Sequence, residues 1–417
     1  MGNKYILSEE FFGGIIQECV TKRNMYLDQD AMHVLKYLEG KGDIDFSNSE
    51  KDELIDKIGL IKVLFEIGIL STNYTFHAGS YKNHLSHPFR VFYDITYKCN
   101  LHCKHCFTES GEPGNKELNL IQKKEFIEQC IKLRVGRISI AGGEPFLCED
   151  IWSFLKECKK NNLEISVTTN GTLFTEEIIK QINEYNIKTL TVSLDAGTED
   201  TMAMIRGVGV FAKVLEGLEL LQRNYKHNYC VKMTLMQPNI HEVEDVIKIA
   251  EKYNCRSVKF NSIRVDGRAR ENSDTLALTR QNYIEVVKRI EKLKEKYRIS
   301  IKSPLNPYSN ENYEYISELG FGCFAGKESM CVDPMGNVRP CSHFPEEFIC
   351  GNIKEITLSE IWHTSPVLEM FRTNKGNEKC TNCTQYDKCR AGCRYRSYSA
   401  GNICEVDPFC YMGVEKQ

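Results

Sequence analysis

Three cysteines lie close together near position 100, with no fourth cysteine beside them. In the segment ITYKCNLHCKHCFTES (95–110), three residues separate Cys99 from Cys103, and two separate Cys103 from Cys106. Cysteine thiolates hold iron–sulfur clusters, and a four-iron cluster normally takes four of them. Three thiolates leave one iron with an open position, as a catalytic zinc keeps one position for water or substrate. The spacing therefore predicts a cluster that binds an exchangeable ligand.

A structural zinc knuckle is the alternative for this segment, with His102 or His105 as the fourth ligand. Both histidines lie inside the cysteine segment itself. Reaching the same ion as the neighbouring cysteines would be cramped there, so the cluster is the favoured interpretation.

From about residue 90 to 300, short β-branched segments alternate with longer helical ones. The strand candidates are 91–97, 137–143, 164–171, 189–197, 230–236 and 257–263. Helical patterns such as LIQKKEFIEQCIKL and TEEIIKQINEY lie between them. Six alternations predict an α/β fold with right-handed crossovers and a parallel sheet, either a barrel or an open doubly wound sheet.

Glycine and polar residues follow the strand candidates where chemistry would be expected. The first candidate leads into the three cysteines, and the next three run out into Gly142-Gly143-Glu144-Pro145, Thr169-Asn170-Gly171 and Ser193-Leu194-Asp195. Each group taken singly could simply form a turn, because Gly, Pro, Asn and Asp are common turn residues. Because the carboxyl ends of parallel strands meet at one rim, where such folds bind ligands, the four groups together predict a site.

The cysteine pattern also resembles a known family. Cys99-x3-Cys103-x2-Cys106, followed by Phe107 and by GGEP at 142–145, resembles the radical S-adenosylmethionine (SAM) enzymes. His105 departs from the family, in which an aromatic residue is more usual there. The resemblance implies a partial (β/α)6 barrel over residues 90–305 and a [4Fe-4S] cluster whose open iron binds SAM. It also implies reductive cleavage of SAM to a 5'-deoxyadenosyl radical that abstracts a hydrogen atom.

The resemblance further implies which residues contact SAM. The backbone of Gly142 and Gly143 and the Glu144 carboxylate would hold the methionine ammonium group. The residues placed to bind the ribose or the methionine carboxylate are Asn170, Ser193 and Asp195. Arg206 would pair with the same carboxylate in a bidentate manner, with a surface helix-capping role as its alternative. VDGRARE (265–271) resembles the Gly-Arg-Ala segment that follows the sixth strand in the family.

Ten of the 19 cysteines fall between residues 323 and 410. The odd total and the clustering argue against structural disulfides and for metal ligands. The spacing resembles the SPASM extension of radical SAM enzymes and implies a domain over 310–417 with two auxiliary clusters, three [4Fe-4S] clusters in all. The implied ligands are Cys323, Cys331, Cys341 and Cys393 for the first, and Cys380, Cys383, Cys389 and Cys410 for the second. Cys404 is the rival to Cys410, and a pair of zinc ribbons is the alternative for the whole segment.

The first 85 residues precede the barrel and require a function of their own. A strand-like start, a helical pattern over 25–40, a polar loop and a second helical pattern over 52–70 predict a small winged-helix-like domain. This segment resembles the leader-recognition domain of enzymes that modify ribosomally made peptides (RiPPs). The resemblance implies that residues 1–85 bind a precursor's leader by β-augmentation and so tether the core peptide. An accessory domain that only shields the barrel is the alternative.

Composition excludes several other classes of function. The net charge of −3 and the mixed 27% of charged residues indicate no nucleic-acid surface. No signal-peptide pattern opens the chain, and Lys62 and Glu66 interrupt its most apolar window, so a cytoplasmic protein without a membrane span is expected.

Taken together, the resemblances predict a radical SAM peptide maturase. It would form a thioether or carbon–carbon crosslink in a ribosomal precursor peptide and take electrons from a flavodoxin- or ferredoxin-type donor. Epimerisation of a residue is also compatible. The alternatives are a sulfatase-type formylglycine maturase, a cofactor-biosynthesis SPASM enzyme, and a zinc-stabilised scaffold without activity.

Overall fold

The computed structural model describes residues 5–10, 13–18, 24–29, 31–32, 35, 74–77, 84–113, 116–185, 187, 189–303 and 322–412. The chain divides into two compact units. One comprises Met1–His87 with Glu311–Gly320, and the other comprises Pro88–Asn310 with Phe321–Gln417. The larger unit therefore contains both the predicted barrel and the cysteine-rich segment.

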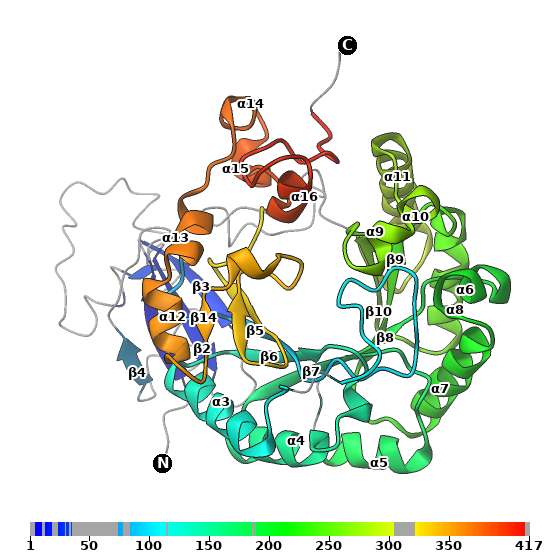
Figure 1. The fold of residues 1–417 in the computed structure, drawn as a ribbon, viewed down its shortest axis with the longest axis horizontal. Helices are drawn as coiled ribbons and strands as arrows, with labels where there is room; N and C mark the ends of the chain where they lie inside the picture. The colour runs from blue at the N-terminus through cyan, green and yellow to red at the C-terminus, as the bar shows by residue number, and fades with distance from the viewer. Residues whose placement is uncertain are drawn as a thin grey trace, which may run out of the picture. The chain divides into compact units, whose positions relative to one another are not determined.

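A curved sheet forms the larger unit, in the order β11-β10-β9-β8-β7-β6-β5-β12-β13-β14 (Figure 1). Its parallel strands are β5 (Arg90–Asp94), β6 (Arg137–Ala141), β7 (Glu164–Thr169), β8 (Thr189–Ser193), β9 (Tyr229–Leu235), β10 (Ser257–Ser262) and β11 (Ser300–Lys302). β12 (Ser329–Val332) adds in parallel beside β5, and β13 (Asn337–Arg339) and β14 (Gly351–Asn352) follow antiparallel. All six predicted strands and the α/β class are confirmed.

Helices cover the convex side of this sheet, as Figure 1 shows. They are α3 (Leu120–Lys132), α4 (Ile151–Lys160), α5 (Glu176–Glu184), α6 (Glu199–Arg206), α7 (Val210–Asn224), α8 (Val243–Lys252) and α11 (Arg280–Lys296). Short helices α9 (Arg268–Glu271) and α10 (Ser273–Leu276) follow β10, and the C-terminal segment adds α12 (Leu358–Thr364), α13 (Pro366–Thr373), α14 (Glu378–Thr381), α15 (Tyr386–Cys389) and α16 (Arg394–Ser399). Among the described residues, no helix is long and apolar enough to cross a membrane.

Strand alternation gives the sheet one apolar face and one polar face. Val91, Tyr93, Ile138 and Ile140 are buried in the core, where Tyr93 packs on Phe126 of α3 with ring centroids 4.8 Å apart. Because successive side chains point to opposite faces, the intervening residues of the strands face the concave side. Those residues are mostly polar: Asp94, Ser139, Ser166, Thr191, Ser193, Lys232 and Lys259. The concave side is therefore suited to a polar ligand.

The smaller unit contains a four-stranded sheet in the order β3-β2-β1-β4. β1 (Tyr5–Glu10), β2 (Gly13–Glu18) and β3 (Asn24–Asp28) form an antiparallel meander, and β4 (Tyr74–His77) pairs with β1 in parallel.

This sheet agrees with the strand-like start expected for the domain but corrects the start of its first predicted helix, over 25–40. Residues 25–28, predicted as helix, pair with β2 as a strand, and Leu27 is buried with Ile15 and Ile16. Their apolar spacing satisfies both a helix and a strand, and pairing with a neighbouring strand decides between them. The second predicted helix, over 52–70, lies outside the described residues.

Candidate functional site

The three cysteines lie in one loop that directly follows β5. The amide of Cys99 donates to the carbonyl of Gly111 at 2.8 Å, and the amide of Gly111 donates to that of Tyr97 at 3.0 Å. Farther along, the Lys104 amide donates to the carbonyl of Ile205 on α6 at 3.0 Å. The loop is thus closed at its base and attached to the barrel at its middle, which holds the three cysteines in one place.

The three thiols lie near enough to influence one another. The pKa of Cys99 is raised to about 11, chiefly by burial, and the thiols of Cys103 and Cys106 add to the shift. The pKa of Cys103 is also raised by burial, although the nearby Arg206 guanidinium partly opposes the shift. A metal ligand must be deprotonated, so this environment favours the thiolates only when positive charge is supplied among them, as iron would supply it.

The predicted Gly142-Gly143-Glu144 turn holds this loop through its backbone. The amide of Gly143 donates to the carbonyl of Thr96 at 2.7 Å, and that of Glu144 donates to the carbonyl of Lys98 at 2.8 Å. A Cβ at Gly143 would lie 2.3 Å from the Lys98 oxygen, and one at Gly142 would lie 2.4 Å from that of Thr96. Gly142 also has a φ of +122°, which L side chains rarely adopt. Glycine is therefore required where β6 meets the cysteine loop.

Gly143→Ala is expected to destabilise the protein by about 1–3 kcal/mol, because the added methyl overlaps the Lys98 carbonyl and the neighbouring backbone cannot move freely. Anaerobic urea unfolding of the apoprotein measures the change. Gly111→Ala is a matched control in the same loop, since nothing lies within 4 Å of its Cβ position. The control should change the free energy of unfolding by less than about 0.5 kcal/mol. Equal effects of the two substitutions would contradict this account of the contact.

Glu144 connects the ends of β6 and β7. Its side chain is fully buried, and its carboxylate accepts from the Thr169 hydroxyl at 2.8 Å and the Asn170 amide at 2.7 Å. Burial raises its pKa to about 7, although these hydrogen bonds oppose the shift. A cationic ligand beside it would favour the ionised carboxylate. The carboxylate is thus already fixed by the strand ends, as a group that orients an ammonium must be.

Asn170 connects the rim of β7 to the cysteine loop. Its side-chain nitrogen Nδ2 donates to the side-chain oxygen of Asn100 at 2.9 Å, and its side-chain oxygen accepts from the Thr172 hydroxyl at 2.7 Å. Asn100 in turn donates to the same hydroxyl at 2.9 Å. Because Asn100 is next to Cys99 in the chain, this network fixes the cysteine loop relative to the end of β7.

Asp195 and Arg206 form a buried ion pair at the same rim. The Arg206 guanidinium donates to Asp195 Oδ2 from Nε at 2.7 Å and from Nη2 at 2.6 Å, and its Nη1 lies 3.8 Å from the sulfur of Cys103. Burial opposes ionisation of Asp195, but Arg206, His105 and the Thr234 amide together lower its pKa. Arg206 is 9% exposed, so the surface-capping alternative is wrong for it. The pair places a guanidinium directly behind the cysteine loop.

His105 also faces Asp195, with 3.2 Å between Nε2 and Oδ2. Burial lowers the pKa of His105 to about 4 despite the nearby carboxylate. Its Nδ1 is buried and has no hydrogen-bond partner among the described residues. The side chain thus turns toward the barrel rim, and its Nε2 is committed to Asp195.

Three further polar residues gather on the concave side and were not predicted from the sequence. Ser193, which was predicted, is buried at the end of β8 in register with Lys232 on β9. Burial lowers the pKa of Lys232 and raises that of Asp94 to about 7. Burial also lowers the pKa of His343, with Arg264 and Lys232 adding to the effect. Strand alternation could have identified Asp94 and Lys232, but nothing in the sequence marked His343.

The first predicted auxiliary set comes together from distant parts of the cysteine-rich segment. Cys331 lies on β12 beside β5, and its pKa is raised by burial and by Cys341. The pKa of Cys341 is raised to about 12 by burial, with contributions from Cys323 and Cys393. Arg264, after β10, donates to the sulfur of Cys393 at 3.7 Å. The four thiols are therefore electrostatic neighbours, and one of them contacts the barrel.

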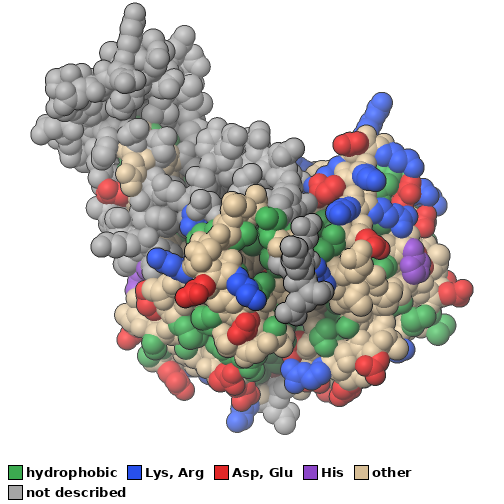
Figure 2. All heavy atoms as spheres, turned by 90° about the horizontal axis from the view of Figure 1, so that it is seen from above, with side chains coloured by type: hydrophobic (Ala, Val, Ile, Leu, Met, Phe, Trp, Pro, Cys, Tyr) green, Lys and Arg blue, Asp and Glu red, His purple; other side chains and the backbone are tan. Residues whose placement is uncertain are grey.

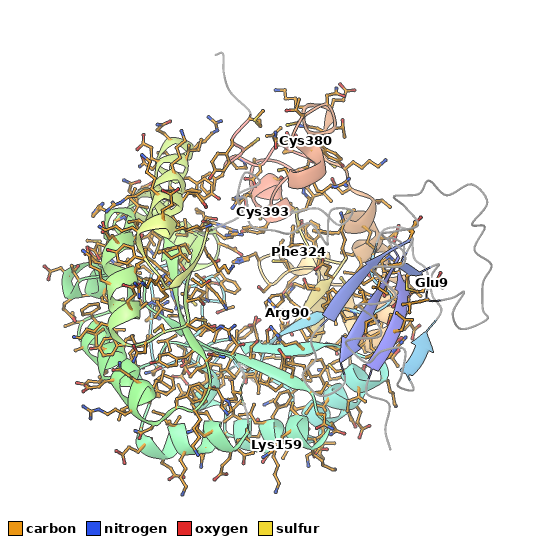
Figure 3. The ribbon with its side chains drawn as sticks, turned by 180° about the vertical axis from the view of Figure 1, so that it is seen from behind. Glu9, Arg90, Lys159, Phe324, Cys380 and Cys393 are labelled. Atoms are coloured by element: carbon orange, nitrogen blue, oxygen red, sulfur yellow. The ribbon has the colours of Figure 1, made fainter. Side chains whose placement is uncertain are left out.

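The second predicted set is also a group of neighbours. Burial, Cys410 and Cys383 raise the pKa of Cys380, and burial, Cys410 and Cys380 are among the causes that raise that of Cys389 to about 11. Cys404, in contrast, is exposed and accepts from the Asn374 side chain at 3.3 Å. Figure 3 shows Cys393 nearer the concave side of the sheet and Cys380 farther out. The geometry favours Cys410 over Cys404 as the fourth member.

The spacing of these thiols also bears on the zinc alternatives. A single zinc ion needs several ligands converging at about 2.3 Å from one point. In the described part of the chain, no three His, Cys, Asp or Glu side chains form such a group. In a four-iron cluster each thiolate binds a different iron, so its ligands stand farther apart. The described thiols therefore offer no ready-made site for a single zinc ion.

The fold and these cysteines define a class of enzyme. Residues 93–251 match the radical SAM superfamily, and residues 323–384 match the SPASM family, an iron–sulfur cluster-binding domain. The chain is therefore a radical SAM enzyme with an SPASM domain.

Similar proteins of known function are distant but extend over most of the chain. Mycofactocin maturase MftC of Mycobacterium ulcerans is 23% identical over 344 residues, 80% of this chain and 90% of its own. AdoMet-dependent heme synthase of Methanosarcina barkeri is 26% identical and covers 78% of this chain and 96% of its own. The subtilosin biosynthesis protein AlbA of Bacillus subtilis is 25% identical and covers 85% of this chain and 79% of its own.

One solved fold is similar from end to end. Streptococcus suis SuiB, in a crystal structure with the precursor peptide SuiA, has a TM-score of 0.72 to this chain. The two share 15% identity, and the match covers 99% of each chain. At this identity the match establishes the fold alone.

Proposed function

We propose that this chain is a radical SAM peptide maturase that modifies a ribosomal precursor peptide. The observation that carries the proposal is the combination of a complete radical SAM/SPASM unit with a separate β-sheet unit before it. The mycofactocin maturase MftC, the bacteriocin biosynthesis protein AlbA and the SuiB structure with its precursor peptide support the class of substrate. A thioether or a carbon–carbon crosslink is the proposed product bond.

Three [4Fe-4S] clusters are proposed. The ligands of the first are Cys99, Cys103 and Cys106, and the auxiliary clusters take the two sets of four thiols described above. When bound, the first cluster and SAM supply a 5'-deoxyadenosyl radical that abstracts hydrogen from the peptide. The chain's own contribution is positional: Glu144, Asn170 and the Asp195–Arg206 pair fix the cysteine loop against the strand ends.

The polar residues at the carboxyl ends of β6, β7 and β8, which form the polar rim together with Arg206 of α6, provide the proposed contacts to SAM. Glu144 is the anion suited to the methionine ammonium group, and Gly142 and Gly143 are the backbone beside it. Arg206 is proposed for the methionine carboxylate, and Asn170, Ser193 and Asp195 for the ribose or the same carboxylate. Because Asp195 already pairs with Arg206 at 2.6 Å, binding of the carboxylate would share that guanidinium rather than occupy it alone.

Leader binding is assigned to residues 1–85. Among the described strands, in the order β3-β2-β1-β4, β3 and β4 lie at the edges of the sheet. An edge strand presents unpaired amides and carbonyls to which an extended peptide can add. This supports capture of a leader as a further strand.

The electron donor, the location in the cell and a second candidate function complete the proposal. The electron donor would be a flavodoxin- or ferredoxin-type protein. All the described cysteines are free thiols, which supports a reducing cytoplasm as the location. A cofactor-biosynthesis activity is the second candidate, because AdoMet-dependent heme synthase is among the similar proteins.

The test uses the anaerobically reconstituted enzyme with SAM, dithionite and candidate precursor peptides encoded beside its gene. Formation of 5'-deoxyadenosine should increase when the right precursor is added, and mass spectrometry should show that the peptide has lost about two hydrogens if a crosslink forms by net oxidation. A haem precursor serves as the competing substrate. Turnover of that compound with no change in any peptide would reject the maturase.

A further inference from the structure

A solvent-open groove of about 410 Å³ adjoins the cysteine loop. One wall is residues 100–102 and 104 of that loop, and the other is the end of α6, the turn at 207–209 and the start of α7. The walls are joined by the 3.0 Å hydrogen bond from the Lys104 amide to Ile205. None of the SAM contacts proposed above needs this groove, apart from Arg206, whose side chain extends from its wall to Asp195.

The charged residues that line the groove have one sign. They are Lys104, Arg206 and Lys213, and no carboxylate is among the lining residues. Lys104 and Lys213 are exposed, and neither has an ion-pair partner among the described residues. On the face seen in Figure 2, acidic and basic side chains are interspersed. Asp195 compensates the charge of Arg206, so in a chain of net charge −3 the two exposed lysines make the groove a local cationic site.

Exposed apolar side chains stand beside these cations. Val208 is 91% exposed and Met204 is 49% exposed, and both line the groove. Gly207 and Gly209 flank Val208 with φ of +118° and +75°, a backbone that raises the Val208 side chain out of the fold. Exposed apolar side chains beside charged ones can supply the apolar part of a contact with another protein.

The position of the groove indicates which kind of protein. Lys104 is the residue next to Cys103, and the Arg206 guanidinium lies 3.8 Å from the Cys103 sulfur. The groove is thus separated from the proposed cluster only by the loop that holds it. A redox partner seated here would face the cluster across one layer of chain.

We propose that this groove is the docking site of an acidic one-electron carrier protein. The inference rests on the proposed function, because it requires a cluster on the three cysteines. In the step, the carrier loses one electron and the cluster gains it, and no bond or proton is exchanged. The cations at Lys104 and Lys213 attract the acidic carrier, and Val208 and Met204 supply apolar contact. Such redox encounters bury little surface and depend on salt.

A double charge reversal, Lys104→Glu with Lys213→Glu, tests the proposal. A bacterial flavodoxin is the probe. Its binding to the full-length holoenzyme, measured by titration at low salt, should weaken at least about tenfold. Cluster reduction by the reduced flavodoxin should slow by a similar factor, whereas reduction by dithionite should not change. Lys180→Glu with Lys288→Glu is the matched control, since both lysines are exposed on outer helices and the change in net charge is the same.

Val208→Glu provides an independent variant, because a side chain that is 91% exposed can change without disturbing the fold. It should weaken flavodoxin binding as well. Unchanged flavodoxin binding in the double reversal, or weakening equal to that of the control, would overturn the proposal. So would selective loss of precursor binding, which would assign the groove to the peptide. Failure of the unmodified enzyme to cleave SAM with dithionite would instead reject the proposed function.

Discussion

Replacing Cys99, Cys103 and Cys106 together by alanine is expected to abolish reductive cleavage of SAM and to leave the auxiliary clusters in place. Each four-iron cluster contributes four irons, so the reconstituted protein should fall from about twelve to about eight irons per chain. The loss of activity should be complete, because the open iron that binds SAM disappears with its three ligands. Iron and sulfide analysis and the yield of 5'-deoxyadenosine measure the two effects separately.

The cysteine-rich segment supplies the controls for that experiment. Cys404→Ala should keep all the iron, because this thiol is exposed and contacts the Asn374 side chain. Cys410→Ala should lose the second auxiliary cluster, because the Cys410 thiol is close enough to those of Cys380 and Cys389 to influence their pKa values. A triple variant that still produces 5'-deoxyadenosine would show that the cysteine loop does not hold the SAM-binding cluster. Iron loss in Cys404→Ala instead of Cys410→Ala would exchange those two assignments.

The sequence was most informative where one physical pattern had one structural solution. The six parallel strands could be predicted because β-branched runs alternate with amphipathic helices. Few folds bury such strands together with the apolar faces of the helices. Gly142 and Gly143 could be marked as unusual, but only the structure shows that their missing side chains admit the carbonyls of Thr96 and Lys98. The reason for those glycines is a contact between segments more than forty residues apart, which spacing alone does not reveal.

Other features depended on tertiary contacts that no local pattern specifies. Arg206 could be read as a surface cap until its burial against Asp195 was visible. Residues 25–28 have apolar spacing compatible with helix and strand, and pairing with β2 made them a strand. His343 lies in an irregular segment, so only the fold brings it beside Lys232 and Arg264.

The contacts of the cysteine loop suggest how the parts of the larger unit cooperate. The loop is held by Gly143 and Glu144 of one strand end, by Asn170 of the next, and by Arg206 of α6. Arg268 extends this support, because its guanidinium donates to the carbonyls of Cys103 and Ser110. Four rim segments therefore fix the loop before any cofactor binds. Such preorganisation is what a site needs in order to place a reactive radical at one atom of a substrate.

Deleting residues 1–87 is expected to separate peptide modification from SAM chemistry. The cut removes the Met1–His87 part of the smaller unit and leaves its Glu311–Gly320 segment in the chain. The Glu10–Ser86 hydrogen bonds are removed with the deleted part. The cysteine loop and the polar rim lie wholly in the remaining unit. Slow SAM cleavage without peptide should therefore continue at a similar rate. Modification of a micromolar precursor should fall about a hundredfold or more, because a short flexible tether supplies an effective concentration in the millimolar range.

A peptide that lacks its leader gives the matched control. If the deleted unit acts only through the leader, the full-length enzyme should modify the leaderless peptide as slowly as the truncated enzyme modifies the whole precursor. Combining the two deletions should cost nothing more, because each removes the same interaction. The excised unit supplied in trans should restore little activity, since it binds the leader without tethering the core. A truncated enzyme that carries its clusters and modifies the precursor as fast as the full chain would refute leader capture, and residues 1–87 would then be an accessory unit.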